Sequence, residues 1–407
     1  MTIWIIEPHD PLIVRDGRPF GPNPGARAKS LVFPFPSTTT GGIRTRAGLN
    51  QEGIFELQGT QLDLLKQLHV RGPLLVQLTN DGHDIAPDQW LVPAPLDALL
   101  LPAQSSDTSK ENTALVQQLL PLALLQDATT DLDQEDLMLV GMSKPDQRKP
   151  VTNAPQYWYW KTFQNWLLNP LQHQGKPTKL FGLGLNGPQH EQRMHVSIDN
   201  DKAVSKDGML FETAGLEFTA SDKQEKSLQK AHRLALAIAV DDDHELAPRL
   251  SNGLASFGGE RRIVSWRKSS ATFPECPQQL TDTIVHDKFC RIFLLTPAYF
   301  TQGYRPKWLL ENRDGVRPQL KAIATSRTQV VSGWDLALGK PKPTKRLASS
   351  GTVLFLSLED NDGETTIRNW VKNIWMHCVS DEPQDQKDGF GLAVIGTWSG
   401  QPEVMKG

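Results

Sequence analysis

The segment Ile3-Trp4-Ile5-Ile6-Glu7-Pro8 near the N-terminus has a second copy, Arg291-Ile292-Phe293-Leu294-Leu295-Thr296-Pro297. Each copy is an apolar run that ends at a proline, which is typical of a strand buried on both faces. Each is followed by a glycine-containing turn in which an arginine precedes a second proline, namely Asp16-Gly17-Arg18-Pro19 and Gly303-Tyr304-Arg305-Pro306. A chain that repeats such a unit is predicted to contain two related domains.

Two glycine loops extend this repetition, because each copy is followed much later by a loop that opens an apolar strand. The first loop, Phe257-Gly258-Gly259-Glu260-Arg261-Arg262, precedes residues 263–266, and the second, Gly389-Phe390-Gly391, precedes residues 392–395. Flexible glycine N–H groups can cradle a phosphate, and they can equally form a tight turn. The two arginines beside the first loop favour a ligand there.

The order of elements in the second repeat indicates the fold class. Residues 292–295, 353–358 and 392–395 read as strands, and one apolar helix face at 3.6-residue spacing is formed by Ile367, Trp370, Val371, Ile374 and Cys378. Such an alternation predicts a ferredoxin-like α+β sandwich, the plan that RNA-recognition domains use. A doubly wound parallel sheet fits less well, because the helices are too few for the strands. We therefore expect two tandem domains, 1–283 and 284–407, joined by a linker at residues 269–283.

The first repeat offers further elements. Ser37 is the expected N-cap of a helix that runs to about Leu49. Residues 73–78, 194–198 and 233–240 read as strands, and residues 115–125 are helical in composition although Pro121 interrupts them. A second helix is expected to place three aromatic side chains on one face: Tyr159, Phe163 and Trp166.

Composition excludes several classes of protein. The three cysteines are scattered, which disfavours a disulfide framework or a zinc site and fits a reducing cytoplasm. No apolar run approaches the roughly 20 residues of a membrane helix, and no secretion signal is evident. The net charge of −3 argues against non-specific coating of nucleic acid, but it permits a local basic groove.

Signals for an enzyme are weak. The acidic segments 241–245 and 360–364 resemble turns between elements more than magnesium or calcium sites. The ten histidines never form an HxxxH or HExxH pattern. We therefore expect no catalytic residue, no metal and no cofactor.

Anion-binding signals are stronger, and the first group lies on the helix that begins near Ser37. Gly41 and Gly42 are expected in its first turns, where the absence of a side chain allows close approach and the helix N-terminus attracts phosphate. Arg44 and Arg46 follow directly. Close packing of the helix on the sheet, with solvated arginines, explains the same pattern equally well.

Two further basic groups are candidates. His195 shares a strand face with Arg193, which suits contact with a phosphate or a base, and a hydrogen-bonded structural histidine is at least as good a reading. The densest basic run is Gly339-Lys340-Pro341-Lys342-Pro343-Thr344-Lys345-Arg346. Its prolines hold it extended, so its cations can track a sugar-phosphate backbone. The alternative is a solvated loop.

Motifs spread over the whole chain resemble one known family. They are WIIEPHDPLIVRDGRPFG, PFPST..GG.RTRAG, VPAPLDA at 92–98, RMHVSID, FGGERRIVSW, GWDLALGKPKPTKR and GFGLAVIGTW. Together they resemble the third subunit of the type III-B CRISPR effector complex, the Cmr or RAMP-module complex, within the RAMP superfamily.

The resemblance implies two ferredoxin-like RAMP domains without a catalytic site of their own. It implies a subunit that holds the 5′ handle of the CRISPR RNA and docks the large HD/Palm-type subunit beside other RAMP subunits in antiviral defence. It also implies an inserted thumb between guide and target RNA, expected around residues 142–199. The candidate RNA-binding residues are Arg15, Arg18, Gly41, Gly42, Arg44, Arg46, Arg193, His195, Gly258, Gly259, Arg261, Arg262, Lys340, Lys342, Lys345, Arg346, Gly389 and Gly391.

Two other functions stay open. A metal-independent endoribonuclease that matures precursor CRISPR RNA would need a general base or acid such as His9 or His195. A purely architectural scaffold would contact only proteins.

Overall fold

The computed structural model describes residues 1–15, 27–28, 30–79, 84–103, 112–123, 130, 132, 137–220, 231–335, 339–360 and 363–405. The chain is mixed α+β and forms two compact units, each assembled from separate stretches of sequence. Unit 1 comprises Met1–Ala86, Gly187–Thr272 and Val330–Arg346, and unit 2 comprises Pro87–Asn186, Phe273–Gln329 and Leu347–Gly407. The expected domain boundary at 283/284 stays a prediction.

Unit 1 is built on an antiparallel sheet in the order β3-β15-β1-β17-β16. Its strands are β1 (Thr2–Pro8), β3 (Val70–Gln77), β15 (His232–Val240), β16 (Gly253–Phe257) and β17 (Arg262–Ser269). The apolar run at residues 3–6 is buried and lies in the central strand β1, as its composition predicts.

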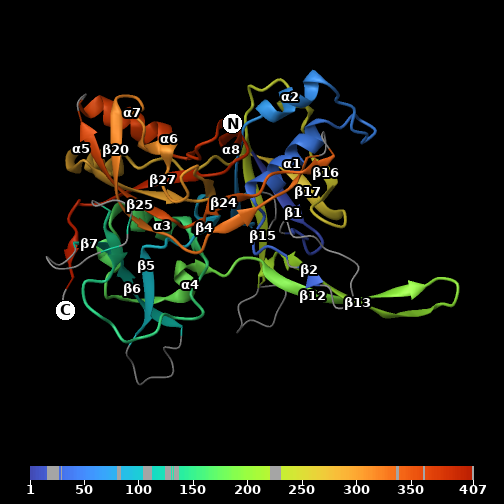
Figure 1. Ribbon diagram of the computed structural model, residues 1–407, viewed down its shortest axis with the longest axis horizontal. Helices are drawn as coiled ribbons and strands as arrows, with labels where there is room; N and C mark the ends of the chain where they lie inside the picture. Colours follow the sequence, from blue (N-terminus) through green and yellow to red (C-terminus); the bar gives the residue numbers. More distant parts are fainter. Residues whose placement is uncertain are drawn as a thin grey trace. The chain divides into compact units, whose positions relative to one another are not determined.

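Unit 1 contains further helices and strands. They are α1 (Pro36–Ala47), α2 (Thr60–Gln67), β2 (Arg27–Ala28), β12 (Gln189–Asp199), β13 (Val204–Glu217), β14 (Thr219–Ala220), β22 (Trp334–Asp335) and β23 (Lys340–Pro341). The strands β12 and β13 form a long hairpin that runs out as a two-stranded arm (Figure 1). This hairpin, at residues 189–217, overlaps the C-terminal end of the expected thumb.

Unit 2 contains an antiparallel sheet in the order β20-β25-β18-β27-β26. Its strands are β18 (Phe289–Leu294), β20 (Val316–Ala324), β25 (Val353–Asp360), β26 (His377–Cys378) and β27 (Leu392–Thr397). The second copy of the repeated segment therefore forms β18, which lies between two neighbours as β1 does in unit 1. The helices α5 (Gln278–Asp287) and α7 (Glu364–Ile374) pack on each other and on β27.

Smaller elements complete unit 2. They are β4 (Trp90–Pro93), β5 (Ala98–Pro102), β6 (Thr113–Gln118), β7 (Leu120–Ala123), β8 (Leu139–Gly141), β9 (Tyr157–Tyr159), α3 (Trp160–Leu168), β10 (Pro177–Lys179), α4 (Leu180–Leu183), β11 (Gly184–Leu185), β19 (Ala298–Tyr299), α6 (Lys307–Leu310), α8 (Pro383–Lys387) and β28 (Glu403–Val404). Two strands, β21 (Gln329–Val331) and β24 (Lys345–Ala348), begin in one unit and end in the other.

Several boundary predictions were wrong. The expected helix at 115–125 is wrong for its described residues 115–123, which belong to β6 and β7, because β6 alternates in burial with period two and pairs with β5 and β10. Residues 124 and 125 lie outside the described residues. The N-cap of α1 is Phe35 rather than Ser37, so Pro36 occupies the first helical position, where its missing N–H costs nothing. Cys378 lies in β26, beyond the end of α7, and the expected linker at 269–283 contains the start of α5.

None of the described helices is both long enough and apolar enough to cross a membrane.

Candidate nucleic-acid interface

Residues 11–15 of unit 1 lie between strand β13 and the turn that joins β16 to β17. Leu12 and Leu216 of β13 exchange two backbone hydrogen bonds of 2.8 Å, and the Gly259 N–H donates to the Ile13 carbonyl at 2.7 Å. The side chains of residues 12–14 are buried, and this burial anchors the segment in the core. Arg15, at the end of the segment, is thereby held beside the glycine turn.

The turn itself has an unusual backbone. Gly258, Glu260 and Arg261 have φ angles of 74°, 56° and 51°. A Cβ atom on Gly258 would lie 2.6 Å from the Ile13 carbonyl oxygen, so only glycine fits there. Left-handed conformations are costly for the two residues with side chains, and such strain often marks functional sites. The turn presents the exposed Arg261 side chain to solvent.

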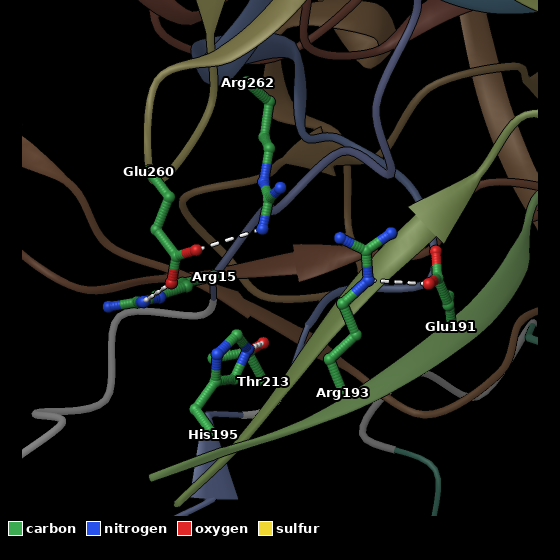
Figure 2. Close-up of polar contacts among 7 residues, drawn as sticks. All are labelled: Arg15, Glu191, Arg193, His195, Thr213, Glu260 and Arg262. Carbon is green, nitrogen blue, oxygen red and sulfur yellow. Dashed lines mark hydrogen bonds and ion pairs between the residues drawn. The ribbon is translucent and has the colours of Figure 1, made fainter. Parts of the chain in front are cut away.

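Glu260 organises two arginines around this turn (Figure 2). Its carboxylate lies 3.4 Å from an Nη of Arg15 and 3.0 Å from an Nη of Arg262. The buried Nε of Arg262 has no hydrogen-bond partner among the described residues. One carboxylate between two guanidinium groups leaves a net positive charge, to which Arg261 adds. Guanidinium donors match the geometry of phosphate oxygens.

His195 and Arg193 lie on the neighbouring hairpin, below and beside this cluster in Figure 2. The His195 Nε2 is 2.8 Å from the Thr213 hydroxyl, and the imidazole stacks on Phe211 with ring centroids 5.2 Å apart. Arg193 donates to Glu191 at 2.6 Å, and this hydrogen bond raises the pKa of its guanidinium. Both side chains therefore have partners on the hairpin, which favours the structural reading of His195.

The glycines of α1 favour packing over anion binding. They occupy the sixth and seventh positions of the helix, away from its first turn. A Cβ atom on Gly42 would lie 2.7 Å from the Phe257 ring and 3.3 Å from the Trp266 ring, so its absence lets α1 approach β16 and β17. A Cβ atom on Gly41 would meet nothing within 4 Å.

The arginines of α1 are engaged in the fold of unit 1. Arg44 donates to the carbonyls of Lys66 and Leu68 at 3.0 and 3.4 Å and thereby caps the C-terminal end of α2. Arg46 donates to the Ser251 carbonyl from Nε and Nη2, at 2.9 and 2.6 Å, and lies over the Trp266 ring. Burial lowers the pKa of the Arg46 guanidinium.

The basic run at residues 339–346 also belongs to unit 1. The short strand β23 pairs with β22, and the Lys342 N–H donates to the Gly333 carbonyl at 2.8 Å. Lys340, Lys342 and Arg346 are exposed, whereas Lys345 is partly buried. The run is therefore extended, as its prolines predict, and it offers at least three cations to solvent.

The second glycine loop has different surroundings in unit 2. Gly389 and Gly391 are buried, and the Gly391 N–H donates to the Pro297 carbonyl at 2.8 Å. A Cβ atom on Gly391 would lie 2.8 Å from the Ser380 amide nitrogen. This placement favours a packing role, and RNA binding by these two glycines stays a prediction.

Sequence reasoning missed three contributors to the interface. Glu260 lies inside the first glycine loop, where its position between arginines was the available signal, while Thr213 and Phe211 gave none because strand pairing alone brings them to His195. Arg18 lies outside the described residues. Among the residues that the structure describes, no group of three His, Cys, Asp or Glu side chains could hold a metal ion.

Comparisons with known proteins identify one family. The family model described as "CRISPR-associated protein (Cas_Cmr3)" matches residues 4–398. Two solved structures, both of the type III-B Cmr-beta complex bound to cognate target RNA and one also with AMPPnP, contain chains that are 16% and 17% identical to this one. Each match covers 87% of this chain and 86% of the other, with TM-scores of 0.46 and 0.45. No curated protein matches the chain significantly by sequence.

Proposed function

The chain belongs to the Cas_Cmr3 family of CRISPR-associated proteins, and from this premise we propose that it is a non-catalytic subunit of a type III-B CRISPR effector that binds the 5′ handle of the CRISPR RNA. The observation that carries the proposal is the cluster of Arg15, Arg261 and Arg262 around the first glycine turn. The proposal includes docking of the large HD/Palm-type subunit and of other RAMP subunits, because the family resemblance implies both.

The proposed contact is between guanidinium groups and RNA phosphates. Arg15 and Arg262 are already positioned by Glu260, so little side-chain entropy is lost when a phosphate binds. Arg261 is exposed on a backbone that both neighbouring strands fix. The exposed cations at 340, 342 and 346 add positive charge to the surface of the same unit. Single-stranded RNA is commonly held through such phosphate contacts.

We further propose that each unit contains a ferredoxin-like domain of the RAMP type. In chain order, β1, β3, β15 and β17 form a sheet in which the first strand lies between the third and the fourth. The strands β18, β20, β25 and β27 have the same order. This common order, with β1 and β18 built from the repeated segment, supports an origin of the two domains by duplication.

The resemblance to a family without a catalytic site favours binding over cleavage of the RNA. Each of the two candidate histidines has one ring nitrogen in contact with a hydroxyl on a neighbouring strand. The His9 Nε2 lies 2.5 Å from the Ser265 Oγ, and His195 contacts Thr213.

The test is the affinity of the purified chain for an RNA that carries the repeat-derived 5′ handle. We expect Arg261→Glu and Arg15→Gln each to weaken binding by about tenfold, the value of one charge-assisted contact, and to lower the salt dependence of binding by about one phosphate contact. Lys268→Glu, an exposed charge change on β17, is the matched control.

Equal affinities for the two variants and the control would contradict this assignment of the site. A guide RNA that crosslinks to other subunits of the assembled effector, but never to this chain, would favour the purely architectural scaffold. Specific cleavage of a repeat-containing transcript that is lost in His195→Ala would favour the endoribonuclease.

A further inference from the structure

The short helix α4 of unit 2 (Figure 1) carries an exposed aromatic side chain. Phe181 is 60% exposed, more than any other phenylalanine, tyrosine or tryptophan side chain that the structure describes. A single exposed ring is common on protein surfaces. Two further features distinguish this one, namely its fixed position and the charge around it.

Buried neighbours on both sides hold Phe181 in place. Leu180 and Leu183, the first and last residues of α4, are buried and anchor the helix in unit 2. Gly184 follows directly, and a Cβ atom there would lie 1.8 Å from the Tyr157 carbonyl oxygen, so the chain passes tightly against β9. The ring is therefore presented from a fixed backbone, and little conformational entropy is lost when a flat ligand stacks on it.

The side chains around Phe181 are basic. The Lys179 Nζ lies over the ring, 5.6 Å from its centroid. The Thr162 hydroxyl donates to the Gly182 carbonyl at 3.2 Å, which brings the first turn of α3, with the exposed Lys161, beside α4. We call Phe181 and the three exposed lysines of this region the Phe181 surface. Among the described residues, no ion-pair partner is found for any of these lysines, which are Lys161, Lys176 and Lys179.

The sequence around the Phe181 surface lacks acidic residues. Residues 147–190 contain no aspartate or glutamate, although the chain of 407 residues has 46 of them. The same stretch contains five lysines and arginines. Cations without neighbouring carboxylates attract a polyanion. An exposed ring beside such cations is the combination by which proteins hold single-stranded nucleic acid, because bases stack on the ring while the cations contact phosphates.

We propose that the Phe181 surface binds single-stranded RNA, with one base stacked on the ring and neighbouring phosphates held by its lysines. The inference rests on the proposed function, because the effector supplies the RNA. It adds a second RNA site, on unit 2, to the arginine cluster proposed on unit 1. Every base has a face that can stack, so we expect this site to bind RNA without a strong sequence preference.

The first experiment identifies what touches the ring in the assembled effector with its guide RNA. The photo-crosslinking amino acid p-benzoylphenylalanine replaces Phe181 in one preparation and Val404, an exposed residue of the same unit, in another. We expect a nuclease-sensitive adduct with RNA at 181 and none at 404. Separate labels on the guide RNA and on an added target RNA show which strand supplies the base.

Three outcomes of this experiment would overturn the proposal. The first is a nuclease-resistant adduct with a companion protein subunit at 181, which would make the Phe181 surface a protein interface. The second is the absence of any adduct at 181. The third is an RNA adduct of equal yield at 404, which would show that the probe reports no specific site.

The second experiment measures the contribution of the ring to the affinity of the purified chain for a single-stranded RNA without the repeat sequence. We expect Phe181→Leu to weaken binding by about tenfold, because an aliphatic side chain offers no ring for stacking. Phe181→Trp keeps a ring and should stay within about threefold of wild type. Val404→Ala is the matched control and should change affinity less than about twofold.

The lysines are tested through the dependence of binding on salt. Lys179→Gln should lower the salt dependence of binding to the same RNA by about one phosphate contact, because a cation that displaces counterions is removed. An unchanged salt dependence in Lys179→Gln, or an affinity of Phe181→Leu equal to that of wild type, would contradict the proposal. Unchanged melting temperatures show that the variants are folded.

The two proposed RNA sites can fail separately. If Arg261→Glu weakens handle binding while Phe181→Leu binds both RNAs as wild type does, only this inference fails. If Phe181→Leu weakens binding of the RNA without the repeat while Arg261→Glu equals its control, the site proposed on unit 1 fails and this inference stands. If the wild-type chain binds neither RNA and enters no ribonucleoprotein, both fail.

Discussion

The two glycine loops of this chain have similar sequences and opposite environments. The loop at 258–262 is a surface turn on unit 1, in which Glu260 pairs with Arg15 and Arg262 while Arg261 is exposed. The loop at 389–391 is buried in unit 2, and its amide groups bond to neighbouring backbone. A glycine loop before a strand therefore allows another backbone segment to approach closely. The residues beside the loop decide whether it can also bind a ligand.

The central strands of the two units differ in the same way. In β1, Glu7 accepts hydrogen bonds from Arg233 and Arg267, and Arg233 remains half exposed. In β18, Arg291 is fully buried and is paired with Asp97, which is also fully buried. The repeated segment thus places an ion pair near solvent in unit 1 and inside the core in unit 2.

The buried pair is held by a complete set of hydrogen bonds. Arg291 donates to Asp97 and to the carbonyls of Thr397 and Trp166, at 2.7 and 2.8 Å for the two carbonyls. The Trp166 indole donates to the other Asp97 oxygen at 2.9 Å. Burial raises the pKa of the Asp97 carboxyl and lowers that of the Arg291 guanidinium, so desolvation opposes both charges.

The largest effect should follow removal of one member of this pair. Asp97→Ala leaves the Arg291 charge buried without its partner, and we expect the free energy of unfolding to fall by about 3–5 kcal/mol. Glu7→Gln in unit 1 should cost about 1 kcal/mol or less, because water screens its partly exposed partners. Chemical denaturation of both variants measures the difference, and equal losses would contradict the contrast between the two strands.

A double variant separates the buried charge from the loss of packing. Asp97→Leu combined with Arg291→Met removes both charges and retains apolar volume. We expect it to recover a large part of the stability lost in Asp97→Ala, because a buried ion pair is often replaceable by apolar side chains.

Glycine-to-alanine variants compare the two glycine loops, and we expect them to have effects of intermediate size on stability. Gly391→Ala places a Cβ atom against the Ser380 amide at a φ of 81°, and we expect a loss of about 2–4 kcal/mol from steric overlap and left-handed strain. Gly258→Ala should displace the turn from Ile13, so that RNA binding weakens together with stability.

Gly53→Ala is the control for backbone strain alone, because its φ is 78° and a Cβ atom there meets nothing within 4 Å. Thermal unfolding and handle-RNA affinity are measured for all three variants. Loss of RNA affinity from Gly391→Ala with stability unchanged would show that the buried loop also serves RNA.

Much of the fold was predictable because the apolar runs of the sequence form the paired strands of the two sheets. The repeated segment predicted both central strands, and the spacing of Ile367, Trp370, Val371 and Ile374 predicted the buried face of α7. The structure of residues 115–125 was not predictable from their sequence. Their apolar residues fit both the helical period of 3.6 and the strand period of two, and only the strands that pair with the segment decide between the two. The family was predictable from motifs that span the chain, and the matching family model confirms it.

The candidate site was predictable only in part. Arg15, Arg261 and Arg262 were identified, but their common position depends on the bridge between Ile13 and Gly259, two residues that lie far apart in sequence. Arg44 and Arg46 carry the same charge and are engaged in capping and packing. Asp97 sits in a quoted motif, yet no local pattern indicates that its partner is residue 291.

The smallest expected effect comes from a cation that already has a partner. Arg193 is exposed near the cluster, but its Nε donates to Glu191 at 2.6 Å, so a phosphate would have to compete with that carboxylate. We expect Arg193→Ala to weaken handle-RNA binding by about twofold or less, the size of an exposed ion-pair contribution. Arg261→Ala, which removes a cation from the strained turn, should weaken it several times more.

Glu191→Gln makes this comparison decisive, because it releases Arg193 without moving it. If the ion pair with Glu191 keeps Arg193 from binding a phosphate, the affinity for the RNA should rise in Glu191→Gln. It should fall again when Arg193→Ala is added. An unchanged affinity in Glu191→Gln would mean that the hairpin face, and not the ion pair, keeps Arg193 away from the RNA. The surface that binds the handle would then end at the turn and would exclude the arm.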